Sequence, residues 1–211
     1  MSKRRFQVAL MSELSMQKIP GGVWGPVGRL NRAIIFDSVP HRPGQFFCVA
    51  AVFGSTVTGA VVPLDVSLRV RHGSNTAESA EIWSERDDPR ELVDAVRAQA
   101  SSLWALALPA KLLVHFVLEQ DYPSQGQLEV ALEAALVERE FGDAVELVAR
   151  LRDRLQRHID RTSMRVASHE ARVLALGKTL EELQTGRGEQ ARTEIVELID
   201  RSRVELGGAK I

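Results

Sequence analysis

The stretch from Gln45 to Arg71 constrains the fold of this chain most, because it holds two different strand patterns. Residues 46–53 are apolar on both alternating faces, which is typical of a strand covered on both sides. Residues 62–71 alternate between apolar and polar side chains, which predicts a strand with one buried face. Turn residues fill the segment 54–59 between them, so we expect a hairpin.

The residues before this stretch predict a helix and another strand. A helix is expected over residues 6–18, ended by Pro20-Gly21-Gly22. A strand is expected over residues 29–39, followed by a turn at residues 40–44, where two prolines and a glycine interrupt any ladder. Strands joined by short loops favour an antiparallel meander, to which residues 82–83 add a short edge element.

The remainder of the chain predicts helices. Asp88-Pro89 fits the N-cap and first position of a helix that runs to about Leu106, and Pro109 starts another. A helix opening at Asp143 is expected to continue to about Gln184, with at most a break near Ser163. A last helix follows the turn at residues 185–188, and two long helices joined by a short turn favour an antiparallel αα-hairpin.

The predicted fold class is therefore α+β: an N-terminal helix, an antiparallel sheet of three to five strands, then helices ending in a long αα-hairpin. Residues 1–123 are expected to form the α+β domain, and residues 124–211 a helical tail of αα-hairpins. The tail offers a surface on which a second copy of the chain can pack, so a homodimer through the C-terminal helices is one hypothesis.

Composition narrows the class of protein. The net charge of −1 conceals an asymmetry, because residues 1–76 hold 9 Lys/Arg against 3 Asp/Glu whereas residues 77–211 hold 18 against 25. Cys48 is the single cysteine, which excludes a disulfide within the chain and a zinc site of several cysteines. No apolar run approaches the roughly 20 residues that span a bilayer, so we expect no membrane partner and a cytoplasmic location.

Two resemblances accompany these patterns. Residues 134–151 resemble one helix–turn–helix unit of a tetratricopeptide repeat, but no second copy follows at a spacing of about 34 residues, so a plain αα-hairpin is the simpler interpretation. Trp24, the run LRVRH at 68–72, Trp83 and the step Ala107-Leu108-Pro109 resemble a bacterial domain-of-unknown-function family with a small antiparallel sheet followed by helices. This second resemblance covers residues 6–120 and implies no activity.

The polar face of the predicted strand over residues 62–71 is the first candidate site. It carries Asp65, Ser67, Arg69 and Arg71, with His72 just beyond. Two guanidiniums beside a carboxylate and an imidazole suit a phosphate or an acidic side chain, because arginine offers fixed bidentate donors. A solvated sheet face explains the same residues. An enzyme site using Asp65, Arg69, Arg71 and His72 is a further hypothesis, and it requires a concave pocket.

The second candidate is a row of arginines that we call the arginine ridge. It comprises Arg150, Arg154, Arg157, Arg161 and Arg165, at spacings of four, three, four and four that place them on one side of a helix. Such a ridge suits a nucleic-acid backbone or an acidic partner. A solvated face, eased by pairs of Glu146 with Arg150 and Asp153 with Arg157, is the simpler explanation, and no aromatic residue interleaves for base stacking.

Signatures of catalysis are scarce. The glycines at 22, 25 and 28 lack the Lys-Ser/Thr ending of a phosphate-binding loop, and the five histidines show no metal-ligand spacing, so we expect no cofactor and no metal. The leading hypothesis is a non-catalytic protein-binding module of the adaptor or toxin-neutralising type. The alternatives are a nucleic-acid-binding protein that uses the arginine ridge, and an enzyme on the polar sheet face.

Overall fold

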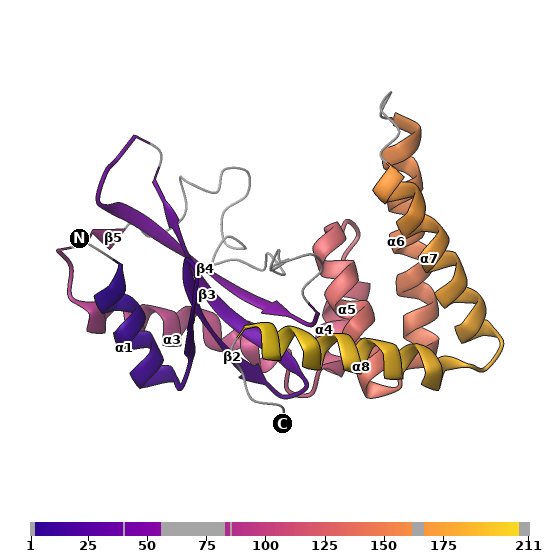
Figure 1. Cartoon of the computed structure of the whole chain (residues 1–211), viewed down its shortest axis with the longest axis horizontal. Helices are drawn as coiled ribbons and strands as arrows, with labels where there is room; N and C mark the ends of the chain where they lie inside the picture. Colours follow the sequence, from indigo (N-terminus) through magenta and orange to yellow (C-terminus); the bar gives the residue numbers. More distant parts are fainter. Residues whose placement is uncertain (1–2, 40, 56–82, 85, 162–166, 207–211) are drawn as a thin grey trace.

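The computed structural model describes residues 3–39, 41–55, 83–84, 86–161 and 167–206 of the chain. It confirms the α+β class, with an N-terminal helix, an antiparallel sheet and a series of helices (Figure 1). The strands are β1 Gln17–Ile19, β2 Gly22–Val27, β3 Leu30–Ser38, β4 Gln45–Phe53 and β5 Trp83–Ser84. The helices are α1 Arg4–Leu14, α3 Pro89–Ala105, α4 Lys111–Leu118, α5 Gln125–Glu138, α6 Phe141–Arg161, α7 Ala167–Gln184 and α8 Gly188–Glu205.

The described strands form one antiparallel meander in the order β1-β2-β3-β4-β5. The predicted strand over residues 29–39 is β3, the doubly apolar stretch is β4, and the predicted edge element is the short β5. Seven of the nine residues of β4 are buried, which confirms a strand covered on both sides. The predicted strand over residues 62–71 and the rest of its hairpin lie outside the described residues.

The N-terminal region differs from expectation at the end of the helix. Helix α1 stops at Leu14, because Ser15 adopts a left-handed conformation with φ of 51°. Pro20-Gly21 does not end the helix; it is the turn of the β1–β2 hairpin, where Gly21 has φ of +76°. Strand β2 was not expected, since its run Gly-Val-Trp-Gly-Pro-Val is rich in residues that weaken strands.

The sheet register assigns the covering helices to its two faces. Partners across antiparallel strands share a face, so Arg32, Ile34 and Phe36 lie on the same side as their β4 partners Val52, Ala50 and Cys48. Helices α1 and α3 cover this side. The ring of Phe6 in α1 meets that of Phe46 at 5.0 Å, and the guanidinium of Arg32 stacks 4.7 Å over the Trp104 ring of α3.

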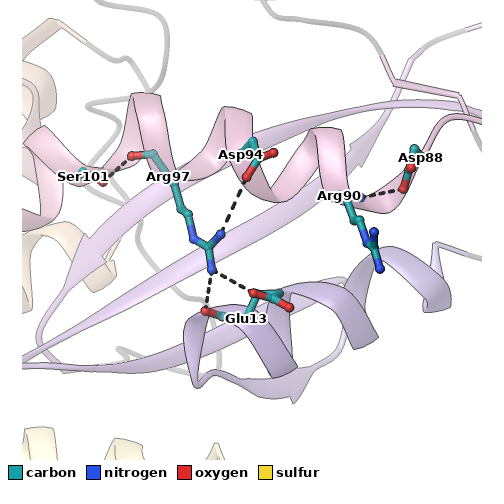
Figure 2. A network of polar contacts seen from close by, with 6 residues as sticks. All are labelled: Glu13, Asp88, Arg90, Asp94, Arg97 and Ser101. Carbon is teal, nitrogen blue, oxygen red and sulfur yellow. Dashed lines mark hydrogen bonds and ion pairs between the residues drawn. The ribbon is translucent and has the colours of Figure 1, made fainter.

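Helices α1 and α3 are held to each other by apolar and polar contacts. The apolar residues predicted to face inward on α3 are all buried, namely Leu92, Val93, Val96, Ala100, Leu103 and Trp104. Asp88 caps the helix by accepting a hydrogen bond from the Arg90 amide, as predicted. Figure 2 shows Arg97 reaching from α3 to the carboxylate of Glu13, 2.9 Å away. Both of these side chains are about half exposed, so the ion pair adds little stability beside the buried faces.

The opposite face of the sheet receives helix α8, which crosses back from the far end of the molecule (Figure 1). Arg203 of α8 is 5% exposed, and its Nε donates to Asn31 Oδ1 at 2.9 Å while its Nη2 donates to the Leu30 carbonyl at 2.9 Å. The Trp24 indole of β2 donates to the Leu206 carbonyl just after α8. Burial lowers the pKa of the Arg203 guanidinium from its ordinary value. The sheet is therefore a middle layer, with α1 and α3 on one face and α8 on the other.

Helices α5 and α6 form the predicted αα-hairpin, and they pack along each other. A capping box starts α5: the Ser124 hydroxyl accepts from the Gln127 amide, and the Gln127 side chain accepts from the Ser124 amide. The helix ends at Arg139, whose φ of 64° is left-handed. Phe141 and Gly142 therefore begin α6.

The long helix expected from Asp143 to Gln184, with at most a break near Ser163, is two helices in the structure, α6 and α7. Helices α6 and α7 lie side by side and run in opposite directions at one end of the molecule (Figure 1). This arrangement buries Leu151 and Leu155 of α6 together with Leu176 and Leu183 of α7, which a single straight helix would leave uncovered. The antiparallel pair is thus α6–α7, and α8 leaves it for the sheet.

The buried hydrophobic side chains form a cluster that extends from Phe6 in α1 to Ile199 in α8. It includes residues on both sides of the boundary expected between residues 123 and 124, and Arg203 and Leu206 bond to the sheet. The division into two domains stays a prediction.

Candidate functional site

The candidate residues from the sequence fall into two groups. Asp65, Ser67, Arg69, Arg71 and His72 of the polar sheet face lie outside the described residues, as does Arg165 of the arginine ridge. The other four arginines of the ridge lie on α6, which carries the candidate site described below.

Arg150 and Arg154 hold the loop that follows α4. Arg150 Nη1 donates to the Leu118 carbonyl at 3.2 Å, and Arg154 Nη1 donates to the Pro123 carbonyl at 2.6 Å. The last carbonyls of a helix lack partners within the helix, and cations are favourable there. Arg150 also forms the predicted ion pair with Glu146. These two arginines therefore stabilise the loop after α4. The spacing of the arginines in the sequence could not distinguish this structural role from a binding role.

Arg157 and Arg161 are exposed and have no carboxylate partner among the described residues. Arg157 Nε donates to the backbone carbonyl of Asp153 at 3.2 Å, in place of the predicted pairing with the Asp153 carboxylate. A main-chain carbonyl leaves the positive charge of the guanidinium uncompensated. Both residues thus keep their charge available to a ligand.

These side chains border an open groove between α6 and the loop after α4, which we call the arginine groove. Its volume is about 620 Å³. It is lined by Leu118, Glu119, Gln120, Asp121, Tyr122, Pro123, Leu128, Arg150, Asp153, Arg154, Arg157, His158 and Arg161. Among the described residues, the lining combines four arginines and a histidine with three carboxylates, around apolar side chains from α4, α5 and the loop.

Tyr122 is the residue of the groove that sequence reasoning missed. It is 92% exposed, and it reaches the groove from the loop between α4 and α5. In the sequence, Tyr122-Pro123 marks only the end of a helix, and about 30 positions separate it from the ridge. The bond from Arg154 to the Pro123 carbonyl brings the two together. An aromatic side chain does accompany the arginines, although none interleaves along the helix.

A second polar cluster lies where β4 ends. The Ser55 amide donates to Glu133 Oε2 of α5 at 3.0 Å, and the Ser55 hydroxyl donates to the same carboxylate. The preceding Gly54 carbonyl accepts from Asn31 Nδ2 at 2.9 Å and from the Ser202 hydroxyl of α8 at 3.5 Å. A side chain at Gly54 would collide with Glu133, because its Cβ would lie 2.0 Å from Oε2. Gly54 and Ser55 thus join the sheet to α5 and α8.

Burial raises the pKa of the Glu133 carboxyl from 4.5 to about 7. The hydrogen bonds from Ser55 oppose this rise, the nearby Glu129 carboxylate adds to it, and Arg172 of α7 opposes it. Glu129 and Arg172 themselves form an ion pair at 2.5 Å. Glu133 therefore holds its proton in the folded chain at pH values where the unfolded chain has released it.

This shift predicts a stability that falls as pH rises. Between about pH 4.5 and pH 7 the folded chain binds more protons than the unfolded chain, so the contribution of Glu133 is complete below that window and lost above it. Glu133 is half-buried, so solvent screens part of this effect. We therefore expect the free energy of unfolding to fall by about 1–2 kcal/mol across this pH window. Glu133→Gln keeps an acceptor for Ser55 but cannot ionise, so its free energy of unfolding should change less between pH 5 and pH 8.

Urea denaturation at both pH values measures this difference, with Glu197→Gln on the exposed side of α8 as the matched control. The control should follow the unmodified protein. A Glu133→Gln variant with the same pH dependence as the unmodified protein would contradict the assignment to Glu133.

The described residues were also compared with the requirements of a metal site and of a membrane-spanning helix. In these ranges no group of three His, Cys, Asp or Glu side chains could hold a metal ion. Among the described helices, each is too short or too polar to cross a bilayer.

Comparisons of the chain with protein families, with curated proteins and with solved structures found no family model, relative or structure that matches it. The two resemblances drawn from the sequence therefore stay expectations.

Proposed function

We propose that this chain is a non-catalytic protein-binding module, and that the arginine groove receives a segment of its partner. The observation that carries the proposal is Tyr122, a 92% exposed aromatic side chain that lines the same groove as Arg157 and Arg161. Tyrosine and arginine are enriched among the residues that dominate binding energy at protein interfaces. An adaptor or a toxin-neutralising protein fits this type of module.

The groove also has the physical character of a peptide site. Arg150 and Arg154 bind the Leu118 and Pro123 carbonyls, so the loop that carries Tyr122 is tied to α6 before any partner arrives. A tied loop loses less conformational entropy on binding than a free one. The apolar surface beside the charges suits a segment with apolar and acidic side chains together.

The mixed charge of the groove disfavours nucleic acid as the ligand. Glu119, Asp121 and Asp153 line the same groove and would repel a phosphate backbone. Arg150 and Arg154 already bind carbonyls at the end of α4 and in the loop after it, which leaves Arg157 and Arg161 for phosphates. Affinity for nucleic acid depends on many such contacts. Nucleic acid is therefore the alternative ligand, and the nuclease treatment in the following experiment distinguishes it from a protein.

Charge reversal in the groove should abolish partner capture without unfolding the chain. The variant Arg157→Glu/Arg161→Glu replaces two exposed side chains, so we expect its free energy of unfolding to stay within about 0.5 kcal/mol of the original. The measurement is capture of the tagged full chain from its own cells, with and without nuclease, followed by identification of what co-purifies in stoichiometric amount.

The matched control is Arg152→Glu/Arg201→Glu, which changes the same charge at exposed positions of α6 and α8 outside the groove lining. A nuclease-resistant protein held by the original chain and the control, but lost from the groove variant, supports the proposal. Nucleic acid that disappears on nuclease treatment would replace it with the alternative. If the groove variant retains the partner, the groove is not the binding site.

A further inference from the structure

A second pocket lies at the opposite end of the molecule, between the start of α1 and the β3–β4 hairpin. We call it the hairpin pocket, and its volume is about 370 Å³. It is lined by Lys3, Ser38, Val39, His41, Arg42, Pro43, Gly44, Gln45 and Phe46. In contrast to the arginine groove, the described residues of this lining include two permanent cations and an imidazole but no carboxylate.

The cations of the pocket are not neutralised within the described part of the chain. Lys3 Nζ donates to the Ser38 hydroxyl at 3.0 Å and lies 5.6 Å from the centre of the Phe46 ring. Arg42 is exposed, and its described hydrogen bonds come from the backbone of the hairpin turn. Arg4 and Arg5 of the first turn of α1 do not belong to the described lining, but that turn has no acidic residue to offset their charge, which is unfavourable at the positive end of a helix. An anion in the pocket would relieve this repulsion.

The hairpin turn holds its residues in a defined arrangement. His41 has a left-handed conformation with φ of 60°, and Gly44 follows with φ of 78°. The Gln45 amide donates to the Arg42 carbonyl, and the Arg42 amide donates to Val39. Two special backbone conformations and two closing hydrogen bonds therefore place His41 and Arg42 on the pocket lining.

Gln45 provides an acceptor as well. Its side-chain oxygen Oε1 is buried and has no hydrogen-bond partner among the described residues, although Gln45 lines the pocket. A buried acceptor without a partner is costly, so a ligand that supplies a donor would be stabilising. The pocket thus combines cationic donors for an anion with one acceptor for a hydroxyl or amine hydrogen.

We propose that the hairpin pocket binds a phosphate group. Phosphate carries between one and two negative charges near neutral pH and has several acceptor oxygens, which match the Lys3 ammonium, the Arg42 guanidinium and the His41 ring. Its protonated form also has a P–OH donor for Gln45 Oε1. A carboxylate carries a single charge and, once ionised, no donor. The phosphate comes either from a soluble phosphomonoester or from a phospholipid headgroup, and the test separates these sources.

The test measures binding to the full chain at constant ionic strength. The soluble probes are inorganic phosphate and phenyl phosphate, titrated by calorimetry against a chloride control. The membrane probe is a vesicle containing phosphatidic acid, compared with a vesicle of phosphatidylcholine alone. The variant Lys3→Gln/Arg42→Gln should weaken binding at least tenfold, because two charge-assisted contacts are lost. The control Lys178→Gln/Arg187→Gln removes two exposed charges near the α7–α8 turn and should leave affinity unchanged.

Each outcome decides for or against the proposal. Binding of the soluble phosphates that the pocket variant loses supports it and indicates a soluble ligand. Binding of phosphatidic acid vesicles alone, also lost in the pocket variant, supports it and indicates a headgroup. The proposal is overturned if no probe binds, if chloride competes as well as phosphate, or if both double variants lose affinity to the same degree. It does not depend on the arginine groove, so either proposal can fail alone.

Discussion

Gly22→Ala is expected to destabilise the chain by about 3 kcal/mol, which lowers the melting temperature by about 10 °C for a protein of this size. Gly22 is buried in β2, paired with Ile35 of β3. A Cβ at this position would lie 2.2 Å from the Ile34 carbonyl oxygen and 3.2 Å from the Ile35 Cα. All of these atoms belong to the backbone, so no side-chain rotation can relieve the collision, and strands β2 and β3 must separate.

Thermal unfolding followed by circular dichroism measures this effect. Gly177→Ala in α7 is the matched control, because a Cβ there meets open space and alanine favours a helix, so its stability should rise by about 0.5–1 kcal/mol. Opposite signs for the two variants support the described packing of β2 on β3. Equal melting temperatures for Gly22→Ala and the original chain would show that these strands are further apart.

Arg203→Ala is expected to cost about 3 kcal/mol and to release α8 from the sheet. The substitution leaves Asn31 Oδ1 buried without its donor and removes the bond to the Leu30 carbonyl. Unpaired polar groups in a buried position are more costly than the loss of an exposed contact. Arg203→Lys keeps the charge but lacks the planar fork that reaches both acceptors, so an intermediate loss is expected.

Hydrogen exchange of the α8 amides and the fluorescence of Trp24, whose indole binds the Leu206 carbonyl, report on the release directly. Arg201→Ala changes an exposed arginine of the same helix and should leave both signals unchanged. If Arg203→Ala unfolds no more easily than this control, the contact between α8 and the sheet does not stabilise the chain.

The parts of the fold that the sequence predicts are those with a local pattern. Strand β4 is apolar at nearly every position, and α3 has a capping aspartate, a proline at its first position and a regular apolar stripe. These patterns involve residues that are close in the sequence, so they can be recognised without knowing how the rest of the chain folds.

The unpredicted parts depend on partners that are distant in sequence. Strand β2 consists of residues that disfavour strands, and its pairing with β1 and β3 overrides this preference. The period of apolar residues is helical on both sides of residues 162–166, so the pattern shows no sign that α7 folds back along α6. The burial of Arg203 depends on Asn31, which lies 172 positions earlier in the chain.

The candidate site likewise has a part that the sequence predicts and a part that depends on distant contacts. The spacing of the arginines placed Arg150, Arg154, Arg157 and Arg161 on one side of a helix, and the structure brings them together along the arginine groove. Tyr122 and the carboxylates of the loop could not be predicted, because they reach the groove through tertiary contacts of α4 with α5 and α5 with α6.

The most direct test of the central claim places a photo-crosslinking amino acid at position 122 of the full chain in its own cells. Tyr122 is 92% exposed at the arginine groove, whereas Val8 is 55% exposed on α1 and serves as the matched control position. We predict a discrete, nuclease-resistant protein adduct at position 122 that is absent at position 8 and disappears with Arg157→Glu/Arg161→Glu. The absence of an adduct at position 122, or one that also forms at position 8, would contradict a protein-binding role for the groove.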